Sequence, residues 1–292
     1  NGDTHYTELE GRSSLRSAIA SKLSSSAGVR IDPDWVTVLA GTQNAFYSAC
    51  RCLFGAGDEV IVLDPSYVTY EASIASTGAK QVRVEQPASD GFRPRIDAIE
   101  AAVTPATKGI VFSNPSNPTG VALRKEELEA IARLAVDNDL WVVVDEVCSD
   151  RVFEGAHHSI VGMPEMLERT VTVSSVSKSY AMTGWRCGWA VGPSELGSHL
   201  RKMSLINFYG LPGFIMEAAN TALREGGEEI ETARAIYKAR RNLVLEELGK
   251  ASEMPLLVPE AGMFLMADVR AHNMNANNFA WDLYRSTGVS VL

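Results

Sequence analysis

The chain has 292 residues, of which 46% are hydrophobic, and a formal net charge of −9. This length allows one large α/β domain and part of a second, since a domain takes roughly 100–200 residues. The acidic balance, with no segment that concentrates Lys and Arg, argues against a nucleic-acid partner, and the longest charge-free run, Trp35 to Cys50, is too short and too polar to span a membrane.

Seven short runs rich in β-branched residues recur along the chain and predict strands. They lie at residues 35–40, 58–64, 80–85, 108–113, 140–147, 169–176 and 187–192. Several are apolar on both faces, as in a sheet that helices cover on each side. Between them lie helical patterns such as Lys125 to Asn138, where Leu128 and Ile131 fall on one apolar stripe. This alternation predicts a three-layer α/β/α fold with a mainly parallel seven-stranded sheet.

The character of the chain changes from about Glu231. A long charged amphipathic helix is followed by the Pro-containing PLLVPE and the strand-like GMFLMADV. We therefore expect a large domain over residues 1–232, then a linker helix and an incomplete smaller α/β domain over 233–292. Because the chain starts without a methionine and stops at a strand-like GVSVL, we expect both ends to lie inside a larger protein.

The cysteines and histidines point to no disulfide framework and no metal site. Cys50, Cys52, Cys148 and Cys187 do not have the number or spacing of a disulfide-rich scaffold, which favours a reducing compartment and predicts a cytoplasmic protein. Cys50 and Cys52 are followed by no second Cys or His pair, and the five histidines lack metal-ligand spacing. We therefore expect small residues packed on a helix at this Cys pair.

Polar residues follow the predicted strands, where ligands bind in open α/β sheets. Gly41-Thr42-Gln43 comes after the first strand and opens an apolar helix, so its N–H groups could hold a phosphate, although such a turn is more often only a connection. Tyr67 follows the second strand, and a tyrosine there usually serves packing. The sequence leaves both alternatives open.

The later strands add an amide loop, a carboxylate and a lysine. SNPSNPTG, residues 113–120, carries two Asn-Pro steps, and Asp145 ends the apolar run WVVVD, where a carboxylate is costly unless it meets a cation. Ser175, Lys178 and Arg186 follow the sixth strand. A nucleotide or a phosphorylated, amine-reactive cofactor would suit this set. The second fits better, because neither G-x-G-x-x-G nor a P-loop pattern is present.

A set of segments in the expected order and spacing resembles the class I/II aminotransferases of fold type I, which use pyridoxal 5'-phosphate. The segments are THYTELEGRSSLR, GTQNAF, GDEVIVLDPSYVTYE, SNPSNPTG, VVVDEV, SSVSKSYAMTGWRCGW and GMFLMADV. Within this family the likeness is greatest to the arginine–pyruvate aminotransferases, through THY, VIVLDPSYVTYE, SKSYAMTGWRCGW and GVSVL.

The resemblance implies a transaminase that moves the amino group of an L-amino acid to a 2-oxo acid by ping-pong kinetics. Lys178 would form the Schiff base with the cofactor and act as the base, and Asp145 would pair with the protonated ring nitrogen. Asn117 would bond the ring hydroxyl, and Tyr67 would stack on the ring.

The resemblance also implies how the phosphate is held. Gly41, Thr42 and Gln43 would bind it at the helix N-terminus, together with Ser175 and Arg186. Tyr6 would reach the phosphate from a second subunit. The active unit would then be a homodimer.

The sequence departs from the family pattern at Cys148, where a tyrosine that bonds the ring oxygen is usual. A thiol is a weak donor, so the outcome is either a slower transaminase or a changed reaction, such as a lyase or cyclase. A third alternative is a non-catalytic sensor fused to a DNA-binding segment, which the acidic chain disfavours. The arginine that grips the substrate carboxylate in this family would lie beyond Leu292.

Overall fold

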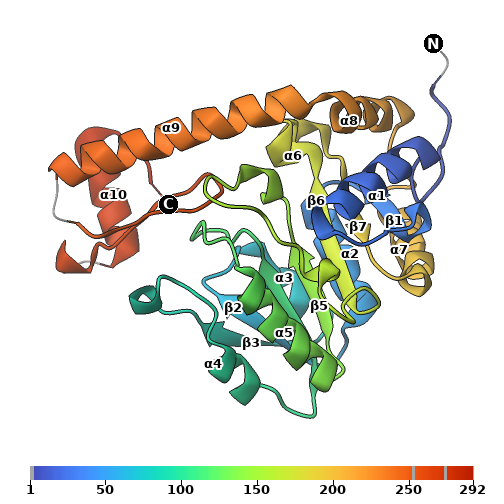
Figure 1. The fold of residues 1–292 in the computed structure, drawn as a ribbon, viewed down its shortest axis with the longest axis horizontal. Coiled ribbons are helices and arrows are strands. Elements are labelled where there is room, and N and C mark those ends of the chain that lie inside the picture. Colours follow the sequence, from blue (N-terminus) through green and yellow to red (C-terminus); the bar gives the residue numbers. More distant parts are fainter. Residues whose placement is uncertain (1–2, 252–253, 273–274, 292) are drawn as a thin grey trace.

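The computed structural model describes residues 3–251, 254–272 and 275–291, and a seven-stranded sheet lies at its centre between two layers of helices (Figure 1). In spatial order the strands are β1, β7, β6, β5, β4, β2 and β3. β7 runs antiparallel to both of its neighbours, and every other pairing is parallel. The prediction of a mainly parallel α/β/α fold is confirmed. The strand bounds are β1 Val36–Leu39, β2 Glu59–Asp64, β3 Lys80–Glu85, β4 Thr107–Ser113, β5 Trp141–Asp145, β6 Thr170–Ser175 and β7 Gly188–Val191.

Helices cover both faces of the sheet. α4 and α5 pack on one face, α2, α3 and α7 pack on the other, and α1 and α8 cover β1 and β7. The helix bounds in this part of the chain are α1 Ser13–Ala27, α2 Thr42–Leu53, α3 Thr69–Ala75, α4 Ile96–Ala101, α5 Lys125–Asp137, α6 Val176–Ser179, α7 Ser194–Asn207 and α8 Gly213–Glu225.

The strands are apolar on both faces because each face carries a separate core. In β2, Ile61 and Leu63 join the cluster under α5, whereas Val60 and Val62 join the cluster under α2 and α3. All four side chains are buried. Successive side chains of a strand point to opposite faces, so a continuous β-branched run is what a sheet covered on both sides requires.

α5 shows why one of the covering helices forms where it does. Its N-terminus is capped by the Glu127 carboxylate, which accepts the backbone N–H of Arg124 at 2.7 Å. Leu128 and Ile131 lie on one stripe and are completely buried against the sheet. The sequence pattern over Lys125 to Asn138 is thus confirmed as an amphipathic helix.

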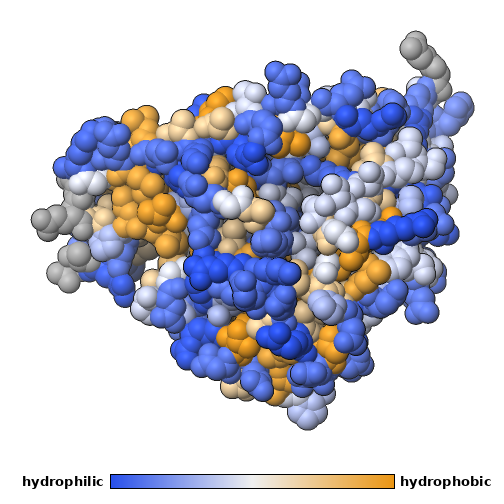
Figure 2. Space-filling model, viewed as in Figure 1, coloured by the Kyte–Doolittle hydropathy of each residue, from blue (hydrophilic) through white to orange (hydrophobic). Residues whose placement is uncertain are grey.

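The C-terminal part of the described chain is built around one long helix, α9 Gly227–Ala251, followed by α10 Ala276–Thr287 (Figure 1). The helix expected from Glu231 begins at Gly227, so the expected boundary at residue 232 falls inside it. In GMFLMADV only β9 Met266–Ala267 is a strand, paired with β8 Leu256–Leu257. Hydrophobic surface is visible over α10 in Figure 2.

No helix in the described residues has the length and apolarity needed to cross a membrane.

We predict that Leu128→Ala lowers the free energy of unfolding by about 3 kcal/mol, because it removes buried methyl groups and leaves a cavity between α5 and the sheet. Arg133→Ala, an exposed position on the same helix, is the control and should change stability by less than about 0.5 kcal/mol. Urea unfolding of both variants measures this. Equal stability of the two variants would contradict the packing described here.

Candidate functional site

The polar residues expected at the site collect along one edge of the sheet. Asp145 ends β5, Ser175 ends β6, and Gly41 follows β1 by two residues. Arg186 lies before β7, but β7 is antiparallel to β1 and β6, so its amino end meets their carboxyl ends. The reversal of this one strand brings the arginine to the edge where the parallel strands terminate.

The turn after β1 presents backbone N–H groups at the start of α2. Gly41 is the N-cap residue, and the backbone N–H groups of Thr42 and Gln43 open the helix without intrahelical acceptors. The Thr42 hydroxyl donates to the Ser175 hydroxyl at 2.8 Å. The Gln43 side chain is bonded to Thr69 and Ser73, so Gln43 offers its backbone to this site. Together these groups suit a phosphate.

Close backbone packing keeps this turn next to Arg186. Gly41 has a φ of +88°, and a side chain there would overlap the Arg186 guanidinium. A Cβ at Gly188 would lie 2.5 Å from the Gly41 carbonyl carbon and 2.7 Å from the Thr42 nitrogen. Arg186 itself is exposed and donates to the carbonyl oxygens of Thr183 and Ala40 at 2.7 Å and 3.4 Å. Two glycines therefore set the position of the guanidinium over the helix N-terminus.

Asp145 is a buried carboxylate held by neutral donors. Its side chain accepts the Val147 backbone N–H at 3.0 Å on Oδ1 and the Tyr70 hydroxyl at 3.0 Å on Oδ2. Burial raises the pKa of Asp145 to about 6, although the bonds from Val147 and Tyr70 and the nearby charge of Lys178 lower it. No ion pair joins Asp145 to a cation in the described part of the chain, so its charge would be stabilised by a positively charged ligand.

Lys178 stands on a single helical turn, α6, that the neighbouring loop holds in place. Arg151 donates to the Lys178 carbonyl oxygen, and the Asp150 carboxylate accepts the Ser179 hydroxyl at 2.5 Å and the Lys22 ammonium at 2.7 Å. The Lys178 side chain is half-buried and forms no hydrogen bond or ion pair within the described residues. Its backbone is thus fixed while its amine is available for chemistry.

Cys148 lies beside Asp145 and Lys178 and is buried. Burial raises the pKa of its thiol to about 11, and the Asp145 charge adds to the rise. The residue is therefore a neutral thiol at physiological pH, which can act only as a weak hydrogen-bond donor.

The two asparagines of the SNPSNPTG loop have different surroundings. Asn114 is buried and uses both ends of its amide, donating to the His158 carbonyl oxygen at 2.8 Å and accepting the Leu123 N–H at 2.9 Å. Asn117 is half-buried, and its amide forms no such bonds in the described chain. Asn114 therefore shapes the loop, whereas Asn117 is free to meet a ligand. Tyr67 exposes 38% of its surface at the same edge of the sheet.

Tyr6 is not brought to this group of residues within its own chain. It exposes 83% of its surface, and its ring lies 4.6 Å from that of Tyr209. The remaining site residues from the sequence analysis all lie at the carboxyl edge of the sheet.

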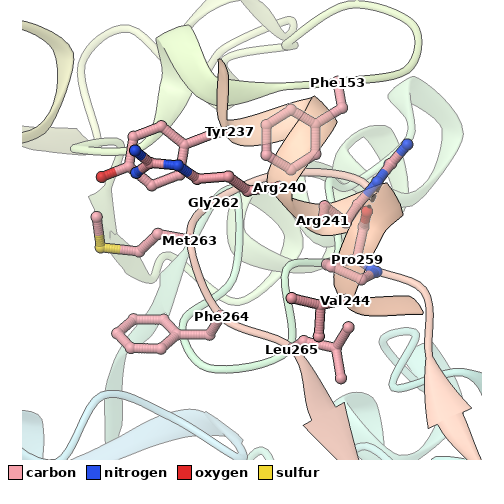
Figure 3. A pocket seen from close by; sticks show the side chains of 10 residues that line it. All are labelled: Phe153, Tyr237, Arg240, Arg241, Val244, Pro259, Gly262, Met263, Phe264 and Leu265. Atoms are coloured by element: carbon pink, nitrogen blue, oxygen red, sulfur yellow. Dashed lines mark hydrogen bonds between the residues drawn. The ribbon is translucent and has the colours of Figure 1, made fainter. Parts of the chain in front are cut away.

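A separate hollow between α9 and residues 259–265 is shown in Figure 3. Phe153, Tyr237 and Met263 surround it, and Arg241 there is fixed by the Pro259 carbonyl oxygen and the Glu154 carboxylate. The Tyr237 ring also packs 4.0 Å from the Arg151 guanidinium, so this wall is connected to the turn that holds Lys178.

Sequence reasoning missed the residues that position the chemical groups. Tyr70 follows Tyr67 by three residues and Arg151 lies in an ordinary turn, and neither has a sequence signal that separates it from a packing residue. Only the fold shows that the Tyr70 hydroxyl meets Asp145 and that Arg151 meets Lys178.

The residues fit pyridoxal 5'-phosphate. The N-terminus of α2, the Ser175 hydroxyl and Arg186 suit its phosphate, and a buried carboxylate without a cation suits its protonated ring nitrogen. The unpaired Lys178 amine suits its aldehyde. In the described residues, no group of three or more His, Cys, Asp or Glu side chains converges as a metal site would require.

The family model for aminotransferase class I and II matches residues 1–292. The chain is 43% identical to the arginine–pyruvate transaminase of Pseudomonas aeruginosa, over all of this chain and 74% of that protein. It is 35% identical to the aspartate/prephenate aminotransferase of Thermus thermophilus, over 91% of this chain and 69% of that protein. The solved aromatic aminotransferase of Pyrococcus horikoshii superposes with a TM-score of 0.97 at 33% identity and covers all of this chain and 79% of that one.

The raised pKa of Asp145 predicts a pH-dependent effect on stability. The pKa of Asp145 is higher in the folded chain than in the unfolded chain, so the protonated carboxyl favours folding. This contribution is fully present below the unfolded pKa and is lost as the pH rises through about 6. The Asp145→Asn side chain cannot ionise, so the variant does not lose this stability. Its free energy of unfolding minus that of the wild type should therefore increase by about 2 kcal/mol from pH 4.5 to pH 8. Urea unfolding of the cofactor-free proteins across this range measures the difference, and parallel pH profiles would contradict it.

Proposed function

The chain belongs to the class I and II aminotransferase family, and we propose that the group of residues around Lys178 and Asp145 is its catalytic site. The protein is a pyridoxal 5'-phosphate-dependent enzyme that transfers the amino group of an amino acid to a 2-oxo acid. When bound, the cofactor supplies an aldehyde that bonds an amine and a ring that withdraws electrons from the substrate.

One observation carries the assignment. The buried Asp145 carboxylate forms no ion pair within the described residues, Lys178 with its unpaired amine lies nearby, and the N-terminus of α2 lies at the same edge of the sheet. Asp145 would hold the protonated ring nitrogen, while Asn117 would bond the ring hydroxyl and Tyr67 would cover the ring face. The phosphate would rest on the backbone of Gly41, Thr42 and Gln43. Ser175 and Arg186 would complete its binding.

Lys178 would move the proton in the reaction. Its backbone is held by Arg151, which leaves its Nζ free. The Nζ would remove the proton from the substrate α-carbon and would then return a proton to the carbon of the cofactor that carries the amino group. Because Lys178 is half-buried and near Asp145, the proton stays in a site with limited access to water. A second 2-oxo acid would reverse these steps, which gives ping-pong kinetics.

Arginine as amino donor and pyruvate as acceptor are the substrates we propose. The support is the 43% identity to a relative whose name states this reaction. Cys148 had left a lyase or cyclase open, but the comparisons give no support to either, so we assign the buried thiol to a transaminase.

A homodimer in the cytoplasm is also part of the proposal. Phe214 exposes 61% of its surface and lines the same hollow as Tyr6 and Tyr209, as expected of a subunit interface. Tyr6 would then complete the phosphate site of the partner. The four cysteines are free in the described chain, which favours a reducing compartment.

We predict that the purified enzyme converts L-arginine and pyruvate to alanine and the matching 2-oxo acid in equal amounts. Lys178→Ala should lower this rate by at least about 1,000-fold because it removes the base, whereas Lys202→Ala, an exposed lysine on α7, should not change it. Aspartate and aromatic amino acids are compared as donors, with product analysis of each mixture. Unchanged turnover by Lys178→Ala would refute the assignment, and release of ammonia would favour a lyase.

We predict that Tyr6→Phe weakens cofactor binding about tenfold, because a hydrogen bond to the charged phosphate is lost. Mixed dimers of Tyr6→Phe with Lys178→Ala subunits test where Tyr6 acts. If it serves the partner, each mixed dimer contains one intact site, and activity returns at a cofactor concentration too low to fill Tyr6→Phe sites. Absence of recovery in mixed dimers shown to form would place Tyr6 outside the partner's site.

A further inference from the structure

We propose that Tyr70 is a positioning residue for Asp145. This inference rests on the proposed function, in which Asp145 meets the cofactor ring nitrogen. Tyr70 does not belong to the set of residues that the family resemblance implies.

The contact between Tyr70 and Asp145 is fully enclosed by protein. Tyr70 exposes 1% of its surface, and its hydroxyl donates to Asp145 Oδ2 at 3.0 Å. The other carboxylate oxygen accepts the Val147 N–H at 3.0 Å. With one donor on each oxygen, the plane of the carboxylate is fixed, and its remaining lone pairs have a set direction.

The Tyr70 ring is itself held firmly, so its hydroxyl has little freedom. It stacks on Phe46 of α2 with ring centroids 4.3 Å apart and meets Tyr67 edge-on at 5.9 Å. Phe46 belongs to the helix whose N-terminus is the proposed phosphate site, and Tyr67 is the residue proposed to cover the ring. Tyr70 therefore contacts elements that would bind three different parts of the cofactor.

The Tyr70 hydroxyl also affects the charge on Asp145. Burial raises the pKa of Asp145, and the Tyr70 bond lowers it, so the hydroxyl favours the ionised carboxylate that a cationic ring requires. Loss of this donor would leave a buried oxygen without its partner and free the carboxylate to rotate. Packing would be preserved in Tyr70→Phe, because the ring remains against Phe46.

The test compares two cofactors on the cofactor-free enzyme. One is pyridoxal 5'-phosphate, and the other is a deaza analogue in which carbon replaces the ring nitrogen. The dissociation constants are measured by absorbance titration for the wild type, Tyr70→Phe and Tyr47→Phe. Tyr47→Phe is the matched control, since it removes a tyrosine hydroxyl from the residue that follows Phe46 in α2 and leaves the Asp145 bond intact.

We expect Tyr70→Phe to bind pyridoxal 5'-phosphate about tenfold more weakly and to bind the deaza analogue as the wild type does. The preference for the natural cofactor should therefore shrink in Tyr70→Phe and persist in Tyr47→Phe. A structural defect would instead weaken both cofactors equally, and that result, or an unchanged preference, would overturn the inference. If the wild type itself shows no preference, the failure lies in the proposed role of Asp145.

Phe46→Leu gives a second test that keeps the Tyr70 hydroxyl. It should reduce the preference for the natural cofactor in the same direction, by about threefold, because it removes the ring that stacks on Tyr70 and holds its hydroxyl at Asp145. If Tyr70→Phe does not fold, this variant decides, and a preference equal to that of the wild type overturns the proposal.

Discussion

A carboxylate buried at the end of a central strand is the constraint on which the site depends. Asp145 is 7% exposed and lies between β4 and β6, so water cannot stabilise its charge. The chain supplies two neutral donors, from Val147 and Tyr70, and places the Lys178 charge nearby. These contacts offset only part of the cost of burial, as the raised pKa of Asp145 shows. A cation bound at this carboxylate would offset the rest.

The sheet topology gives this carboxylate its companions. Parallel strands bring their carboxyl ends to one edge, and the reversed strand β7 adds the residue before its start, Arg186, to the same edge. Gly188 and Gly41 then allow the two backbones to approach so closely that the guanidinium lies over the α2 N-terminus. The carboxylate and the turn proposed to bind phosphate thereby lie on one rigid frame, which fixes the distance that a ligand must bridge.

Much of this arrangement was predictable from sequence. The strands were recognised because a sheet covered on both faces imposes β-branched runs, and the helix over Lys125 to Asn138 followed from its apolar stripe. What could not be predicted were choices between chemically equal residues. Asn114 and Asn117 have the same side chain in the same motif, and only the fold shows that the Asn114 amide is hydrogen-bonded to the backbone of His158 and Leu123. Likewise Tyr67 and Tyr70 differ only in what their rings and hydroxyls meet. The segment GMFLMADV was expected to be strand-like, but within the described residues it pairs over Met266–Ala267 alone, where its partner strand β8 is equally short.

Cofactor affinity and stability are coupled through the same carboxylate. Without a cation, Asp145 lowers the stability of the folded chain as the pH rises from its unfolded pKa through about 6. A cationic ring bound at this carboxylate would remove that penalty, so part of the binding free energy would be the recovery of stability that the empty site gives up. The buried thiol of Cys148 adds no charge at neutral pH and so leaves this balance to Asp145, Tyr70 and Lys178. Asp145, the residue that makes the empty protein less stable, would therefore also be the one that makes it select a protonated ring.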